Sequence, residues 1–167
     1  MNFSRPIKEL TSDQLLALSA NPNTVIKGAA GTGKTMFCIL KARQLCEKGA
    51  SVAIIISTIA LKRFIQKAIN DLQIVNCSVY HQYEWFTKSE NSFDFILIDE
   101  VQDFSLKLVK RIMELSKKGV YLLGDSSQQI FDKTFYDSTT TIPVEEMAAQ
   151  LNFPIIEMKK SVRIKKS

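Results

Sequence analysis

The sequence predicts an α/β domain, a three-layer sandwich whose central sheet is mainly parallel. Three observations predict it. Short apolar or β-branched segments alternate with segments of helical periodicity, residues 52–56 read Val-Ala-Ile-Ile-Ile with no polar face, and a glycine-rich turn follows a predicted strand at residue 28. A strand without a polar face is covered on both sides, as in sheets built from right-handed βαβ units. In such sheets, ligands bind at the carboxyl ends of the strands.

Each element follows from the local pattern. The first predicted helix opens at Thr11, and the next strand, at 24–27, is β-branched and runs into the glycine-rich turn. The second helix carries apolar residues at helical spacing and stops before Gly49, a suitable C-cap. The predicted helices span 11–19, 34–48, 60–72, 106–117 and 144–151, and the predicted strands span 24–27, 51–57, 74–80, 93–98, 120–123 and 154–158. Residues 82–92 receive no element.

The composition is that of a globular protein, with 46% apolar and 23% charged residues. Five of the 22 Lys and Arg residues lie in 159–167, which leaves 17 basic against 17 acidic residues in the remaining chain. The net charge of +5 therefore belongs to the tail and is weak ground for nucleic-acid binding. We predict one domain over residues 1–158, and a basic tail or the start of an interdomain segment over 159–167.

The compartment follows from what the sequence lacks. No apolar run approaches the roughly 18–20 residues that span a membrane, so no membrane partner is expected. Residues 1–10 do not read as a signal peptide. The cysteines Cys38, Cys46 and Cys77 form no C-x-x-C pair, which favours packed free thiols in a reducing cytoplasm.

A phosphate-binding loop is the strongest motif. Residues 28–35 read Gly-Ala-Ala-Gly-Thr-Gly-Lys-Thr and match G-x-x-x-x-G-K-[ST] between a strand and a helix. The glycines let successive N–H groups turn toward a phosphate, and the helix N-terminus faces the same anion. Lys34 is expected near the β- and γ-phosphates, and the hydroxyl of Thr35 on Mg²⁺. The expected nucleotide-binding residues are Gly28, Ala29, Ala30, Gly31, Thr32, Gly33, Lys34 and Thr35.

Two acids end the strand predicted at 93–98. We expect Asp99 to hold Mg²⁺ through water, and Glu100 to orient and deprotonate the water that attacks the γ-phosphate. Their strand is expected to neighbour the phosphate-loop strand. The adjacent Glu argues against most kinases and small GTPases. In the alternative interpretation the acids only cap the next helix, with Asp103 or Ser105 as its N-cap.

Residues 99–103, Asp-Glu-Val-Gln-Asp, resemble the D-E-x-Q-D signature of superfamily 1 helicases of the UvrD/Rep/PcrA group. Other segments follow in the family's order: 57–66 at motif Ia, 79–81 at motif Ib, 124–131 similar to G-D-x-x-Q-x-I-[FY] of motif III, and 160–163 at motif IV. The resemblance implies a first RecA-like domain that binds ATP and Mg²⁺. It also implies a DNA helicase that moves on single-stranded DNA, or RNA, in a full-length protein.

The resemblance assigns roles outside the loop. Gln14 matches the glutamine that reads the adenine edge, although Thr11-x-x-Gln14 is also a capping box. Gln128 is implied to contact the γ-phosphate, and Arg163 to add a positive charge there; the alternatives are a turn residue and a solvated basic tail. Lys34, Glu100, Gln128 and Arg163 are thus the expected catalytic residues.

The implied nucleic-acid contacts are Thr58, Tyr80 and His81, through phosphate bonds and stacking. Tyr80 and His81 read equally well as strand-end residues. Trp85, with Tyr83 and Phe86, is a stacking platform in one interpretation and part of the core or of a partner surface in the other. One aromatic patch without interleaved basic residues favours the second interpretation.

The chain also departs from the family pattern. Met36 and Val162 stand where relatives carry the Arg and Tyr that sandwich the adenine. Residues 82–93 replace an inserted helical subdomain, and a second RecA-like domain with its arginine finger is absent from these 167 residues. We therefore expect ATP binding with slow hydrolysis, completed by a second domain in cis or a partner in trans. The alternatives are an ATP-dependent binding module without motor action and, less favoured, a small phosphotransferase.

Overall fold

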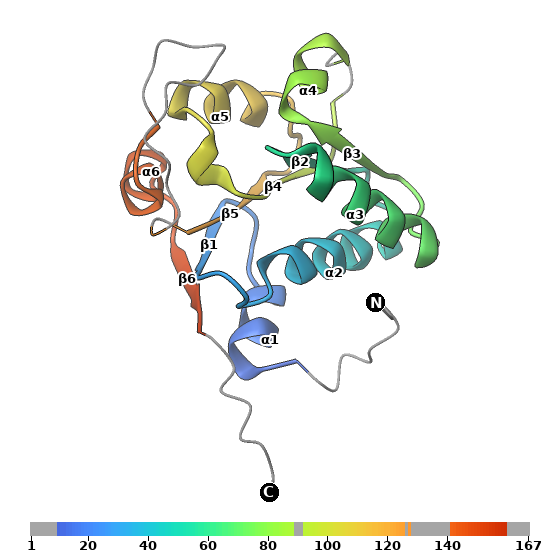
Figure 1. Cartoon of the computed structure of the whole chain (residues 1–167), viewed down its shortest axis with the longest axis horizontal. Coiled ribbons are helices and arrows are strands. Elements are labelled where there is room, and N and C mark those ends of the chain that lie inside the picture. Colours follow the sequence, from blue (N-terminus) through green and yellow to red (C-terminus); the bar gives the residue numbers. More distant parts are fainter. Residues whose placement is uncertain (1–9, 89–91, 126, 128–140, 160–167) are drawn as a thin grey trace, which may run out of the picture.

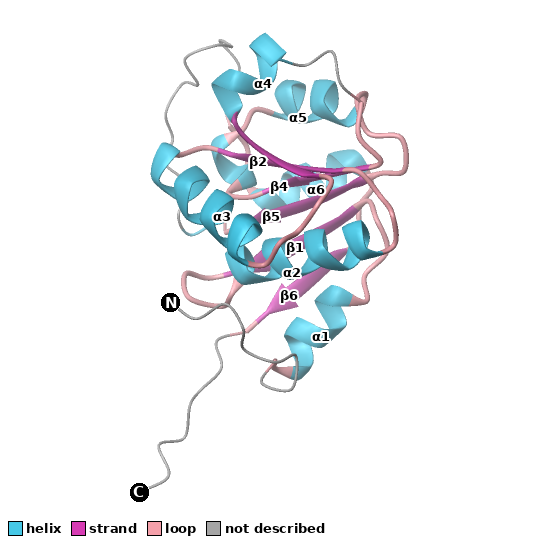
Figure 2. Ribbon diagram, turned by 90° about the vertical axis from the view of Figure 1, so that its right-hand side faces the viewer, coloured by secondary structure: helices cyan, strands magenta, loops and turns pink. Residues whose placement is uncertain are grey.

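A computed structural model describes residues 10–88, 92–125, 127 and 141–159, and it confirms the predicted fold class. Six strands, parallel at every pairing, form one sheet in the order β3-β2-β4-β5-β1-β6 (Figures 1 and 2). The strands are β1 (Thr24–Gly28), β2 (Val52–Ile56), β3 (Cys77–His81), β4 (Phe95–Ile98), β5 (Val120–Gly124) and β6 (Ile155–Met158). The helices are α1 (Ser12–Leu18), α2 (Lys34–Glu47), α3 (Ile59–Asp71), α4 (Gln82–Lys88), the 3-10 helix η2 (Val101–Asp103), α5 (Leu106–Met113) and α6 (Val144–Leu151).

Helices cover both faces of the sheet, which explains why β2 lacks a polar face. Ile54 and Ile56 join one apolar cluster with residues of α1, α2 and α3. Ile55, on the other face of the pleat, joins a second cluster with residues of α4, α5 and α6. Figure 1 shows α2 and α3 on one side of the sheet and α5 and α6 on the other. Because every strand pairing is parallel, the carboxyl ends of all six strands lie at the same edge of the sheet.

One positional prediction was wrong. β4, the strand that directly precedes Asp99, does not neighbour the phosphate-loop strand β1, because β5 pairs with both and lies between them. The link is made instead through α2, which starts at the end of β1 and brings Thr35 to Asp99. A helix crossing one face of the sheet can span the extra strand, whereas adjacent backbone pairing cannot.

Several predicted bounds were also wrong, for local reasons. β3 begins at Cys77 rather than at residue 74, because Gln73 and Asn76 have φ values of 53° and 60°, which interrupt an extended strand. α5 ends at Met113 rather than at residue 117. The N–H of Lys117 donates to the carbonyl of Phe93 at 2.8 Å, which pulls the chain out of the helix.

Helix α4 was not predicted. It follows β3 directly, and the carboxylate of Glu84 accepts the N–H of His81 at 3.1 Å at its start. Trp85 is 3% exposed and packs against Phe93 with ring centroids 5.9 Å apart, so this short helix is held by burial rather than by its own length. The core alternative for Trp85 is the one that the structure supports.

Candidate nucleotide-binding site

The loop after β1 has the backbone that a phosphate cradle requires. Gly31 and Gly33 have φ values of 78° and 94°, which favour glycine. The hydroxyl of Thr32 donates to the carbonyl of Ala29 at 2.8 Å and closes the turn. A Cβ at Gly28 would lie 2.4 Å from Thr32 Oγ1, so this position needs a glycine for close approach. Gly33 caps α2 without a side-chain hydrogen bond, which leaves the first N–H groups of the helix for an anion.

Lys34 lies inside this loop. Its side chain is buried, and Nζ donates to the carbonyl of Gly28 at 2.7 Å and approaches that of Ala29 at 3.5 Å. The ammonium group is therefore held at the centre of the turn, where the sequence places the phosphates. Ala30, which follows Ala29 in the loop, is exposed.

One hydrogen bond joins the two halves of the site. The hydroxyl of Thr35 donates to Asp99 Oδ2 at 3.0 Å, although these residues are 64 positions apart in the sequence. Asp99 is fully buried, and its Oδ1 accepts the N–H of Glu100 at 3.0 Å. The residues that the sequence assigns to Mg²⁺ thus converge, and a carboxylate beside a hydroxyl is a donor set that suits this ion.

The electrostatics of Asp99 fit a cation site. Burial raises the pKa of Asp99 to about 6, and the neighbouring Glu100 carboxylate adds to the rise. The hydrogen bonds from Thr35 and from the Glu100 N–H, together with the charge of Lys34, lower it. A buried carboxylate with a raised pKa gains most from a nearby cation, which favours its ionised form.

Glu100 leaves β4 in a strained conformation. Its φ and ψ are 54° and 47°, in the left-handed region that few non-glycine residues adopt, and such strain clusters at functional sites. Its Oε2 accepts the side-chain amide of Gln102 at 2.6 Å. The capping alternative applies to a different residue: Ser105 caps α5, and its Oγ accepts the N–H of Leu108 at 3.2 Å. Glu100 is the N-cap residue of η2, but its side chain makes no capping hydrogen bond there.

The capping-box interpretation of Gln14 is confirmed, and the same side chain also contacts the phosphate loop. Its Oε1 accepts the Thr11 N–H at 3.0 Å within a capping box, while Nε2 donates to the carbonyl of Thr32 in the phosphate loop at 3.1 Å. Helix α1 is thereby tied to the loop. Met36 and Gln14 line the same small apolar recess beside Gly33. Recognition of adenine by Gln14 stays a prediction.

The family is shown by the sequence itself. Residues 14–133 match the model of the AAA_19 family, described as an AAA domain. The chain belongs to the AAA_19 family. No curated protein matches it.

Solved structures show the fold of this AAA_19 domain. The large terminase of a thermophilic bacteriophage superposes with a TM-score of 0.65 at 11% identity, over 98% of this chain and 48% of that chain. The Hef helicase domain of Pyrococcus furiosus superposes with a TM-score of 0.64 at 11% identity, over 93% of this chain and 39% of that chain. The AAA_19 chain therefore spans about half or less of these proteins, and its fold is the RecA-like α/β fold.

The residues assigned to nucleic acid occupy different environments in the AAA_19 domain. Thr58 is exposed and caps α3, where its Oγ1 accepts the N–H of Leu61 at 3.3 Å. His81 is 7% exposed and its Nε2 bonds to the carbonyl of Ser57 at 2.8 Å. Tyr80 packs edge-on against Trp85, with centroids 5.3 Å apart. The geometry of Tyr80 and His81 supports the strand-end alternative, and their contact with nucleic acid stays a prediction.

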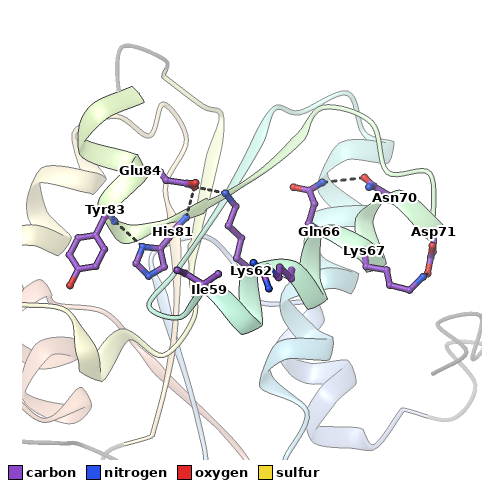
Figure 3. Close-up of a pocket in the computed structure, with 10 residues that line it drawn as sticks. Ile59, Lys62, Gln66, Lys67, Asn70, Asp71, His81, Tyr83 and Glu84 are labelled. Carbon is purple, nitrogen blue, oxygen red and sulfur yellow. Dashed lines mark hydrogen bonds and ion pairs between the residues drawn. The ribbon is translucent and has the colours of Figure 1, made fainter.

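A second concavity of the AAA_19 domain lies along α3, beside the end of β3 and the start of α4 (Figure 3). Its volume is about 690 Å³, and it combines cationic, acidic, apolar and aromatic side chains. Lys62 pairs with Glu84 across it, and Tyr83 is 39% exposed beside the His81 ring. Its lining includes Ile59, Lys62, Arg63, Gln66, Lys67 and Tyr83.

Other predictions for this AAA_19 domain lie outside the described residues: Gln128, Val162, Arg163 and the tail from 160 onward. Two contacts were missed by the sequence. Ser57 Oγ donates to Asp103 at 2.9 Å, and Gln102 bridges Glu100 to the end of β5. The signal available in the sequence was the polar pair Gln102-Asp103 between the apolar residues Val101 and Phe104. In the part of the chain that the structure describes, no helix has the length and apolarity to cross a bilayer.

Proposed function

We propose that this domain binds Mg²⁺-ATP at the carboxyl edge of its sheet and is the first motor domain of a superfamily 1, UvrD-like helicase. The observation that carries the proposal is the Thr35–Asp99 hydrogen bond beside buried Lys34. It brings a phosphate loop and an acidic strand end, distant in sequence, to one place. The family, the fold and the D-E-x-Q-D segment support the same assignment.

Each residue then has one task. The loop N–H groups and Lys34 bind the triphosphate, and Thr35 and Asp99 hold Mg²⁺, which neutralises phosphate charge when bound. Glu100 accepts a proton from the attacking water, and its carboxylate is held by the side-chain amide of Gln102. Gln14 fixes the loop from the side of α1 and contacts the adenine. Gln128 and Arg163 complete the γ-phosphate contacts.

Hydrolysis by this domain alone is expected to be slow. The structural relatives are more than twice as long as the part that this chain matches, since 48% and 39% of their chains are covered. We infer that a second RecA-like domain, in cis or in trans, supplies an arginine finger, which is worth roughly 10³–10⁵ in the rate of related phosphoryl transfer. Coupling of ATP hydrolysis to movement on a single strand belongs to that complete protein.

Calorimetry with Mg²⁺-ATP tests the binding site. Lys34→Ala removes the buried ammonium and is expected to abolish the binding heat, while Lys67→Ala, on the exposed face of α3, is the matched control. Glu100→Gln should bind ATP normally and stop turnover. Wild-type protein that gives no heat with Mg²⁺-ATP would refute the proposal.

The concavity along α3 is the proposed path of single-stranded nucleic acid. Cationic groups and an exposed aromatic ring are what such a strand requires, and the groove starts next to Thr58. Arg63→Glu should weaken binding of an oligonucleotide about tenfold and reduce its salt dependence. Lys48→Glu, at the C-cap of α2 and outside the lining of this concavity, makes the same charge change as a control. If the full-length product captures a protein partner in an ATP-dependent manner but captures no nucleic acid, the chain is an ATP-dependent binding module and not part of a motor.

A further inference from the structure

Gln102 is a buried polar side chain with both ends of its amide engaged. It is 2% exposed and lies in η2, two residues after Glu100. Its Nε2 donates to Glu100 Oε2 at 2.6 Å, and its Oε1 accepts the backbone N–H of Asp125 at 3.2 Å. The side chain therefore spans the distance between the end of β4 and the end of β5.

The chemistry of the two partners fixes the orientation of the amide. A backbone N–H can only donate, so the amide oxygen must face Asp125, and the NH₂ group must then face Glu100. An ionised carboxylate accepts that hydrogen bond, and the charge strengthens it. The arrangement thus holds one carboxylate oxygen of Glu100 in a fixed position.

β5 is shaped around this amide. A Cβ at Gly124 would lie 2.8 Å from Gln102 Oε1 and 2.9 Å from Val101 Cγ1, closer than real Cβ atoms approach other groups. Glycine at 124 therefore leaves room for the amide. Beyond it, Asp125 Oδ1 accepts the N–H and the hydroxyl of Ser127 at 2.9 and 2.7 Å. The amide contact is thus followed by the hydrogen bonds between Ser127 and Asp125, just after β5.

The side chain of Asp125 also carries an oxygen without a hydrogen-bond partner. Asp125 is 4% exposed, and its Oδ2 has no hydrogen-bond partner among the described residues. A buried acceptor without a donor costs free energy, which a donor arriving with the nucleotide or its water would recover. Gln102 thus connects Glu100 to a segment with a physical reason to respond to ligand.

We propose that Gln102 is a positioning residue that holds the carboxylate of Glu100 and ties it to the end of β5. The inference rests on the proposed function, in which Glu100 acts on the attacking water. Glu100 reaches the site on a flexible two-carbon arm, and small displacements of a reacting group lower rates steeply. Gln102 itself acts through Glu100.

Two variants separate the two ends of the amide. Gln102→Met removes both hydrogen bonds without adding charge. Gln102→Glu keeps an acceptor for Asp125 but loses the donor to Glu100. Gln150→Glu is the matched control, because Gln150 also donates its amide to a glutamate, Glu146, at 3.1 Å, but on the exposed face of α6.

Three measurements are made on the chain: ATP affinity by calorimetry, single-turnover hydrolysis, and hydrogen exchange of the Asp125 amide. Both Gln102 variants should bind Mg²⁺-ATP within about twofold of wild type and hydrolyse it up to about 10²-fold more slowly. Exchange at Asp125 should accelerate in Gln102→Met and stay slow in Gln102→Glu.

Different outcomes would refute the role of Gln102 and the proposed ATP-binding function. No binding of ATP by wild-type protein refutes the proposed function, and the inference falls with it. Normal ATP binding with unchanged turnover in Gln102→Met refutes the inference alone. So does a loss of ATP affinity equal to the loss of rate, since that would indicate a merely structural role.

Discussion

Asp99 combines full burial with a negative charge, and Asp99→Asn measures what that combination costs the fold. The amide can keep both hydrogen bonds of the carboxylate. Its oxygen can accept the N–H of Glu100, and its NH₂ can donate to the Thr35 hydroxyl, which rotates to accept. The substitution therefore removes the charge and little else.

The magnitude follows from the pKa of Asp99. Burial, reinforced by the Glu100 carboxylate, raises it from the ordinary 3.8 to about 6. At about 1.4 kcal/mol for each pH unit, this difference corresponds to about 3 kcal/mol. Because the folded pKa exceeds the unfolded one, the stability contributed by protonated Asp99 is fully present below about pH 3.8 and is lost as the pH rises through about 6.

Urea unfolding in the presence of EDTA is the assay. At about pH 7.5 Asp99→Asn should raise the free energy of unfolding by about 2–3 kcal/mol, because Asn never ionises. The gain should fall to roughly half at about pH 5 and nearly vanish below about pH 4, where the carboxyl is neutral in the unfolded wild-type chain as well as in the folded one. The variant should also lose affinity for Mg²⁺-ATP, a stability gain at the expense of function.

Asp71→Asn is the control, since Asp71 lies exposed beside Lys67 on α3 and its charge is hydrated. Its effect should stay within about 0.5 kcal/mol at every pH. An Asp99→Asn protein no more stable than wild type near neutral pH, or a gain that does not depend on pH, would contradict the burial argument.

Three further substitutions test the supports of the site. Gln14→Glu keeps the cap on Thr11 but loses the donor to the Thr32 carbonyl, so helix content by circular dichroism should be unchanged while calorimetry shows weaker ATP binding; equal ATP affinity would count against the role of Gln14. Gly33→Ala requires a non-glycine residue to adopt a φ of 94° and places a Cβ 2.6 Å from Gln14 Nε2. It should therefore lower the free energy of unfolding in urea by about 1–2 kcal/mol and weaken ATP binding. Stability and ATP affinity equal to those of wild type would show that the loop tolerates a Cβ. Trp85→Ala empties a 3% exposed position beside Tyr80 and Phe93, and it should lower the free energy of unfolding by about 3–5 kcal/mol. The protein that remains folded should bind ATP with unchanged affinity. A decrease in stability below about 1 kcal/mol would disprove the place of Trp85 in the core.

Local patterns were read well from the sequence because short-range physics produces them. The phosphate loop is such a pattern: glycines permit the left-handed turns at 31 and 33, and the helix must start at Lys34. The buried strand β2 is another, since an all-apolar pleat has to be covered on both faces. The short helix α4 escaped notice, because seven residues form a helix only when tertiary contacts such as those of Trp85 hold it.

The sequence alone thus determined the α/β class, the triphosphate loop and the acids that end a buried strand. Tertiary structure decided that β5 lies between β1 and β4, that Thr35 nevertheless reaches Asp99, that His81 turns inward to Ser57, and that Gln102 joins Glu100 to the end of β5. The physical reason is range. Turns, caps and periodicity depend on neighbours a few residues apart, whereas strand order and buried polar contacts depend on which distant segments share one core.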